Sequence, residues 1–181
     1  KEYRRQRQMC IRDSSMAGVL DGVKRPGHFE GVVTVVNKLF NIIRPEYVTF
    51  GEKDRQQLMI VQKMIEDFNH DIEVLAVETE REDTGLAKSS RNTNLSEQEL
   101  SEAPHVYESL QLGNKLIQSG ERHVEEIKNQ ITAHIDENTS GIIDDLQILS
   151  HPDLGMMTHV ESDAIISVSY THLRAHETKA N

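Results

Sequence analysis

Two segments in the first half of the chain have helical spacing of apolar residues. Between residues 28 and 43 the apolar positions recur at steps of three and four, which predicts a helix ending before Pro45, although the Val-rich composition leaves a strand as the alternative. Residues 54–68 predict a second amphipathic helix with Asp54 as N-cap. Its expected inner face consists of Leu58, Val61, Met64, Ile65 and Phe68.

Short apolar runs separate these helices. Residues 47–50 and 72–79 are rich in β-branched and aromatic side chains, and they predict buried strands. The order helix, strand, helix, strand indicates a parallel α/β sheet with helices on both faces. In such sheets ligands bind at the carboxyl ends of the strands, where residues 51–54 follow the first strand.

The pattern changes after residue 94. A capping-box sequence, Ser96-x-x-Glu99, opens a long helical pattern over residues 95–121. A further helix is predicted over residues 122–137, and residues 144–150 and 163–166 predict strands. The apolar stripe of this helix consists of Val124, Ile127, Ile131 and Ile135. A run of helices followed by strands indicates a second, α+β unit, with the boundary near residues 80–85.

Composition narrows the function classes. The net charge of −10 argues against a general nucleic-acid or membrane-surface protein, and no apolar run approaches the roughly 20 residues of a membrane helix. One cysteine excludes an internal disulfide framework and is compatible with a reducing compartment. The chain contains no tryptophan, so its core must depend on Val, Ile, Leu and Met.

Both ends lack a helical or strand period. Residues 4–14 and 168–178 resemble in-frame translations of the two partner adapters used in transposase-based sequencing. We therefore expect residues 1–14 and 167–181 to be adapter-derived and exclude them from the fold prediction. Residues 15–80 are then a first, partial α/β domain, and residues 81–166 a second, truncated α+β domain.

Three polar segments are candidates for binding chemistry. In "GEKD", Gly51 permits close backbone approach, Lys53 offers a positive charge and Asp54 precedes a helix N-terminus, which favours anions. In "GLAKSSRN", Lys88 and Arg91 can neutralise phosphate, while the hydroxyls of Ser89 and Ser90 can donate hydrogen bonds to it. An ordinary capped turn and a polar interdomain loop are the respective alternatives.

The third segment is "RPGHF". His28 could serve as a hydrogen-bond donor or an acid/base, although a histidine beside an aromatic residue is more often structural. The other histidines lack metal-ligand spacing, so no zinc site is expected.

Three strings in this order carry a resemblance: "RPGHFEGVVTVVNKLFNIIRPEYVTFGEKDRQQL", "REDTGLAKSSRN" and "LSEQ". Together they resemble the pantothenate synthetase (pantoate–β-alanine ligase) family of the nucleotidyltransferase superfamily, over about residues 19–166. The resemblance implies part of a Rossmann-like domain followed by a smaller lid domain. It also implies a cytoplasmic homodimer that uses ATP and Mg²⁺ to activate pantoate as pantoyl adenylate, which the amine of β-alanine then attacks.

The resemblance also assigns residues by matching position. It implies an ATP loop of Gly51, Glu52, Lys53 and Asp54, and a second ATP loop of Lys88, Ser89, Ser90 and Arg91. Lys53, Ser89, Ser90 and Arg91 are the residues expected to act in catalysis, with no protein-bound metal. Gln57 is expected to contact pantoate, and Arg25 and His28 to line the cleft.

The chain departs from the family pattern in several places. Thr84 stands where the family has Asp, Lys88 where it has an apolar residue, and Asn94 where it commonly has Tyr. The His-x-Gly-His signature of the family's N-terminal half does not occur in the sequence. We therefore expect an internal fragment that is catalytically incomplete. The alternative is a non-catalytic nucleotide-binding or regulatory protein that retains half of the cleft.

Overall fold

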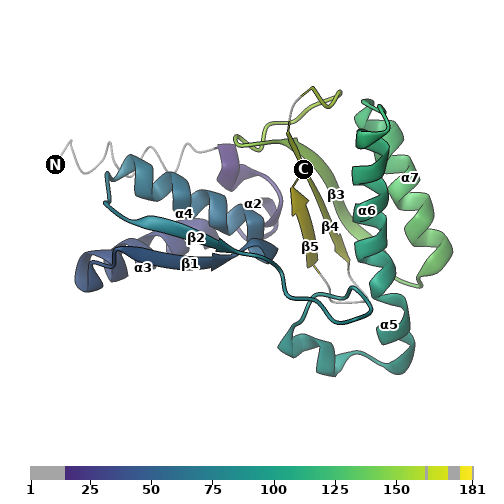
Figure 1. Cartoon of the computed structure of the whole chain (residues 1–181), viewed down its shortest axis with the longest axis horizontal. Coiled ribbons are helices and arrows are strands. Elements are labelled where there is room, and N and C mark those ends of the chain that lie inside the picture. The colour runs from purple at the N-terminus through teal and green to yellow at the C-terminus, as the bar shows by residue number, and fades with distance from the viewer. Residues whose placement is uncertain (1–14, 162, 171–175, 181) are drawn as a thin grey trace. The chain divides into compact units, whose positions relative to one another are not determined.

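A computed structural model describes residues 15–161, 163–170 and 176–180, and divides the chain into two compact units, Lys1–Glu78 and Thr79–Asn181. The predictions made for residues 1–14 and 171–175 lie outside the described residues. The first unit contains η1 (Ser15–Gly18), α2 (Asp21–Lys24), α3 (His28–Ile43), β1 (Tyr47–Gly51), η2 (Glu52–Asp54), α4 (Arg55–Asp67) and β2 (Glu73–Val77). The second contains η3 (Ser90–Asn94), α5 (Glu97–Glu102), α6 (Pro104–Gln118), α7 (Val124–Asn138), β3 (Ile143–Ser150), β4 (Ala164–Tyr170) and β5 (His176–Ala180) (Figure 1).

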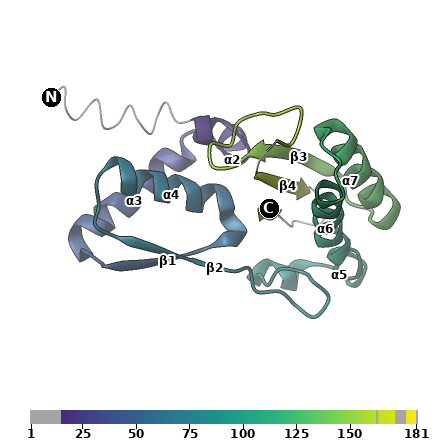
Figure 2. The same ribbon diagram turned by 45° about the horizontal axis from the view of Figure 1, so that its top comes forward.

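The predicted parallel pairing in the first unit is confirmed. β1 and β2 pair in parallel, with Tyr47 opposite Glu73 and Gly51 opposite Val77, and α4 connects them. α3 and α4 pack against each other on one side of these strands (Figure 2). The carboxyl end of β1 therefore lies beside that of β2, and the turn into α4 begins there.

The strands of this unit are less buried than the sequence predicts. Tyr47, Leu75 and Val77 share one face of the pair, and their exposed fractions are 59%, 42% and 50%. The helices α3 and α4 cover the opposite face of the pair. Among the described residues, no helix or strand covers the face that carries these three side chains. The prediction of buried strands is therefore wrong for this face, because helices pack only against the other side of the strands.

The long helix α3 matches its predicted bounds, but its apolar surface is divided. Phe29, Val33 and Phe40 are buried. Four other apolar residues of α3 are exposed: Val35, Leu39, Ile42 and Ile43. The spacing thus predicts the helix but does not show which face is packed.

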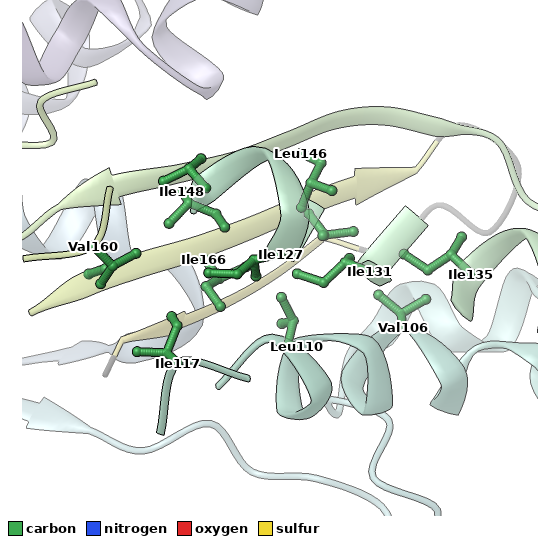
Figure 3. Close-up of a cluster of buried hydrophobic side chains, with 13 residues drawn as sticks. Val106, Leu110, Ile117, Ile127, Ile131, Ile135, Leu146, Ile148, Val160 and Ile166 are labelled. Carbon is green, nitrogen blue, oxygen red and sulfur yellow. The ribbon is translucent and has the colours of Figure 1, made fainter. Parts of the chain in front are cut away.

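The second unit packs two long helices on an antiparallel sheet in the order β3–β4–β5. The predicted stripe of α7 is confirmed, because Val124, Ile127, Ile131 and Ile135 are 0–4% exposed. It meets residues of α6, β3 and β4 in one continuous core (Figure 3). These residues include Val106, Leu110, Ile117, Leu146, Ile148 and Ile166, and Val160 from the segment between β3 and β4 joins the same core.

The helix predicted over residues 95–121 is two helices. The capping box is present: Ser96 N donates to Glu99 Oε2 at 2.8 Å, and Glu99 N donates to Ser96 Oγ at 3.2 Å. α5 ends at Glu102, and Pro104 begins α6. Proline lacks the N–H that a continuous helix would need, but it is suited to a first helical turn.

Strand structure continues beyond residue 166, in residues that the sequence analysis left out of the fold prediction. Residues 167–170 complete β4, and residues 176–180 form β5. Ser167 and Val168 are buried where β4 pairs with β3. These residues therefore belong to the sheet although their sequence shows no clear strand period, while an adapter origin for them stays a prediction.

Glu102 joins the end of α5 to the segment after α7. Its Oε2 accepts hydrogen bonds from Ser140 N at 2.8 Å and Ser140 Oγ at 2.7 Å, and these bonds lower the pKa of the Glu102 carboxyl. A carboxyl whose pKa is lower in the folded state stabilises the fold above its unfolded pKa, and this stabilisation is lost as pH falls through the folded pKa.

We therefore expect Glu102→Gln to lower the thermal midpoint at neutral pH, and the difference from the parent chain to vanish in acid. Thermal unfolding followed by circular dichroism at several pH values measures this. Glu137→Gln, which replaces an exposed carboxylate without a hydrogen bond among the described residues, is the control. A pH-independent difference for Glu102→Gln would contradict the assignment.

Candidate functional site

The turn after β1 brings together the first group of candidate residues. Gly51 ends the strand, Glu52–Asp54 form η2, and α4 begins at Arg55. A Cβ added at Gly51 would meet no atom within 4 Å, so the space beside this backbone is open. The turn thus lies at the carboxyl end of the parallel strands, as the sequence predicts.

The charged side chains of this turn differ in their contacts. Glu52 Oε1 accepts from Arg55 Nη1 at 3.1 Å. Lys53 is half-buried and its ammonium has no hydrogen-bond or ion-pair partner in the part of the chain that the structure describes. Asp54 occupies the predicted N-cap position, but its side chain makes no capping bond. The predicted capping interaction of Asp54 is therefore wrong. The preceding η2 turn leaves Asp54 at φ −94° and ψ 61°, outside the usual N-cap conformation.

Gln56, which the sequence analysis missed, holds this turn to the start of the unit. Its Nε2 donates to the carbonyls of Met16 (2.6 Å) and Val19 (2.8 Å), and its Oε1 accepts from Asp21 N (3.2 Å). It is 8% exposed. The available signal was its position, because Gln56 lies on the same helical face as the buried Ile60 and Met64.

The neighbouring Gln57 is half-buried and makes no hydrogen bond among the described residues. Arg25 and His28 flank a turn with Gly27 at φ 79°, in the left-handed region. His28 N donates to the carbonyl of Arg25 at 3.0 Å, and its ring lies against Phe29 with centroids 5.1 Å apart. Gln56 Oε1 accepts from Asp21 N at the start of α2, and Arg25 N donates to the Asp21 carbonyl, so these hydrogen bonds connect the start of α4 to this turn through Asp21.

The second group lies in the second unit, after a small hairpin. Glu82 N donates to the carbonyl of Leu86, and Lys88 N to that of Glu80, both at 2.8 Å. Gly85 turns the chain at φ 91°, a conformation that favours glycine. The loop is therefore ordered by its own backbone bonds.

Tyr107 of α6 anchors this hairpin. The Arg81 guanidinium carbon lies 3.5 Å from the centroid of the Tyr107 ring, and Arg81 Nη1 donates to the Gly85 carbonyl at 3.0 Å. A Cβ at Gly85 would lie 3.2 Å from the Tyr107 ring. Leu86 and Ala87 are buried beneath the loop.

The four candidate residues after the hairpin have distinct environments. Lys88 Nζ lies 2.6 Å from Glu80 Oε1, and this hydrogen bond and charge raise the pKa of Lys88. Ser89 caps η3 by accepting from Arg91 N at 3.2 Å. Ser90 is exposed, and the exposed Arg91 guanidinium has no partner among the residues that the structure describes.

Comparisons with known proteins show the family of this chain. The family model of pantoate–beta-alanine ligases matches residues 2–177. This chain belongs to that family. Pantothenate synthetase of Staphylococcus epidermidis is 51% identical over 160 residues, which cover 88% of this chain and 56% of that protein. The Staphylococcus carnosus enzyme is 48% identical over 167 residues, covering 92% and 58% respectively.

Solved structures of the family show the same fold. Pantothenate synthetase from Thermus thermophilus superposes with a TM-score of 0.82 at 32% identity, covering 92% of this chain and 60% of that one. The Francisella tularensis pantoate–beta-alanine ligase, complexed with beta-gamma ATP and beta-alanine, gives a TM-score of 0.64 at 28% identity, covering 91% and 55%. This chain spans less than two thirds of the length of these relatives.

No helix in the described parts of the chain is long and apolar enough to cross a membrane.

Proposed function

We propose that this chain carries ATP-binding and pantoate-binding parts of a ligase that condenses pantoate with β-alanine. The observation that carries the proposal is the Lys53 ammonium, which lacks a partner among the described residues at the carboxyl end of a parallel strand. Such a position, ahead of a helix N-terminus, favours a phosphate. The Francisella tularensis relative, complexed with beta-gamma ATP and beta-alanine, supports ATP as the ligand.

In the proposed reaction, a pantoate carboxylate oxygen attacks the α-phosphorus of ATP, and pyrophosphate leaves. The β-alanine amine then attacks the acyl carbon of pantoyl adenylate, loses a proton, and AMP leaves. Both steps create negative charge on oxygens that cationic and hydroxyl groups can stabilise. Lys53 and Arg91 would balance phosphate charge, Ser89 and Ser90 would donate hydrogen bonds, and the amide of Gln57 would orient pantoate.

The remaining residues have supporting roles in this proposal. Gly51 leaves room for the nucleotide, and Glu52 fixes Arg55 through their ion pair. Mg²⁺ would arrive with ATP and offset its phosphate charge. The exposed Asp54 carboxylate, which has no hydrogen bond among the described residues, fits a hard cation of this kind. Arg25 and His28 would line the cleft, and the complete protein would be a cytoplasmic homodimer.

Replacing Lys53 or Arg91 by alanine should weaken ATP binding at least tenfold, because a hydrogen bond to a charged group contributes about 1.5–3 kcal/mol. Calorimetric titration of the chain with Mg·ATP measures the change. Lys63→Ala is the matched control: Lys63 also lies in the first unit but is paired with Glu66 and Asp67. Equal affinities of the Lys53, Arg91 and control variants would refute the proposed ATP loops.

The same titration tests whether Lys88 contacts ATP, through substitution of its ion-pair partner Glu80. Glu80→Gln removes the carboxylate that holds the Lys88 ammonium at 2.6 Å. If Lys88 contacts phosphate, this variant binds ATP more tightly than the parent chain, and Lys88→Met binds it more weakly. Unchanged affinity in both variants would exclude Lys88 from the ATP loop.

We further propose that the 181-residue chain alone does not form pantothenate. It spans 56% of the Staphylococcus epidermidis enzyme, and the sequence contains no His-x-Gly-His signature. Incubation with pantoate, β-alanine and Mg·ATP should therefore give no product. ATP binding without turnover supports an incomplete site, whereas sustained pantothenate formation would refute it.

A further inference from the structure

Three potential metal ligands meet between α6 and α7. His105 and Glu108 are one helical turn apart on α6, and His134 lies in the last two turns of α7. Glu108 Oε2 is 2.7 Å from His105 Nδ1 and 3.7 Å from His134 Nε2. One ligand atom from each residue lies within 4.8 Å of the other two. The fold thus assembles a group that the sequence spacing did not reveal, because its third member comes from another helix.

Contacts among the described residues leave one member of this group, His134, without a hydrogen bond at Nε2. His134 Nε2 is buried and makes no hydrogen bond with any residue that the structure describes, although it faces the Glu108 carboxylate. The two imidazole rings are 6.2 Å apart between centroids and meet edge to face, so they do not bond directly to each other. A buried polar atom without a partner is unusual and calls for a ligand, an ion or a water.

The donor types favour a particular class of ion. Two imidazoles and one carboxylate suit zinc and similar divalent transition metals, whereas Mg²⁺ and Ca²⁺ prefer oxygen ligands alone. Ligands placed about 2.1 Å from a tetrahedral zinc ion are about 3.4 Å apart. The separations here bracket that value, so side-chain adjustments of about 1 Å would close the site.

Its surroundings leave space for further ligands. The side chains of His105, Glu108 and His134 are 32%, 48% and 27% exposed, which leaves water free to complete the coordination. The nearby Glu102 carboxylate is occupied by the hydroxyl and backbone N–H of Ser140. It therefore does not compete with Glu108 as the acidic ligand.

We propose that His105, Glu108 and His134 bind one divalent transition-metal ion of the zinc class, which links α6 to α7. The site lies within the second unit and is independent of the proposed ATP chemistry. Binding of the ion would stabilise the packing of the two helices, because a metal that binds only the folded state shifts the unfolding equilibrium.

The decisive experiment titrates the 181-residue chain with Zn²⁺ in competition with a chromophoric chelator. Glu108→Gln keeps the size of the side chain and an acceptor for His105 but removes the anionic ligand. We expect this variant and His134→Gln each to weaken the binding of one zinc equivalent at least tenfold. Glu125→Gln is the matched control, since Glu125 is an exposed glutamate on α7 whose contact is with Lys128.

Two further readouts locate the ion. Zinc should shift the imidazole nitrogen resonances of His105 and His134 together in the parent chain, and neither shift should occur with Glu108→Gln. It should also raise the thermal midpoint of the parent chain and the control but not of Glu108→Gln. Equal zinc binding by the parent chain and Glu108→Gln, or zinc-dependent shifts confined to other histidines, would overturn the proposal.

Discussion

Replacing Ile131 by alanine should lower the stability of the second unit by about 2–5 kcal/mol. Ile131 is fully buried in the core between α6, α7 and the antiparallel sheet. The substitution removes buried apolar groups and leaves a cavity that the neighbouring helices can only partly fill. Hydrogen exchange of the α7 amides measures this stability within the second unit, independently of the first.

Ile142→Ala provides the matched control for this change. Ile142 belongs to the same unit, but its side chain is 58% exposed. The same chemical truncation should therefore change stability by no more than about 0.5 kcal/mol. Similar effects of the two substitutions would show that the core assigned to Ile131 is not packed.

Gly113 allows a second test of the same contact. A Cβ at Gly113 would lie 2.7 Å from Ile131 Cδ1 and 2.8 Å from Ile166 Cδ1, both on buried side chains. Gly113→Ala should therefore cost about 1–3 kcal/mol through overpacking, despite a helix-propensity gain of about 1 kcal/mol. In the Ile131→Ala background the first contact is absent, so the cost should fall by at least about 0.5 kcal/mol. Strict additivity would contradict the close approach of α6 to α7.

Local sequence patterns predicted the second unit most accurately where one pattern corresponds to one set of contacts. The stripe of α7 is buried at all four predicted positions, and the capping box of α5 forms both reciprocal bonds. These features depend on residues a few positions apart. The break at Pro104 was equally local, but the apolar spacing on both sides of it obscured the change from one helix to the next.

Other features depend on contacts between different elements, which the local spacing of residues does not predict. The strands β1 and β2 have apolar sequences, yet only one side of each is packed. Ser89 was predicted as a phosphate donor, and the structure shows that its oxygen also caps η3. His134 joins residues 26 and 29 positions earlier in the sequence, so no motif within one helix could predict that group.

The resemblance to a known family supplied predictions that the periodicity of apolar residues could not. It led to the family, which the comparisons show, and to candidate residues in two different units. The structure adds their local environments, which distinguish Lys88, already paired with Glu80, from Lys53 and Arg91, which have no partner among the described residues. This difference supplies the contrast for the proposed ATP titrations.

Replacing Gln56 by leucine should release the first segment of the chain from α4. Leucine has a similar size but cannot bond to the carbonyls of Met16 and Val19 or to the N–H of Asp21. An unsatisfied buried polar group costs about 1–3 kcal/mol, so we expect local destabilisation of about 2–4 kcal/mol after partial rehydration. Trypsin cleavage after the exposed Lys24 should become at least tenfold faster, because proteolysis follows the population of the opened segment.

Gln57→Leu is the control for this prediction because Gln57 is the adjacent glutamine and has no hydrogen bond among the described residues. Its cleavage rate after Lys24 should stay within about twofold of the parent chain, which corresponds to less than about 0.5 kcal/mol. Similar rates for the two variants would contradict the anchoring role of Gln56. If only Gln56→Leu opens the segment, the position of Arg25 and His28 depends on a residue in the first turn of α4. The turn at the end of β1 and the turn before α3 would then be parts of one hydrogen-bonded assembly.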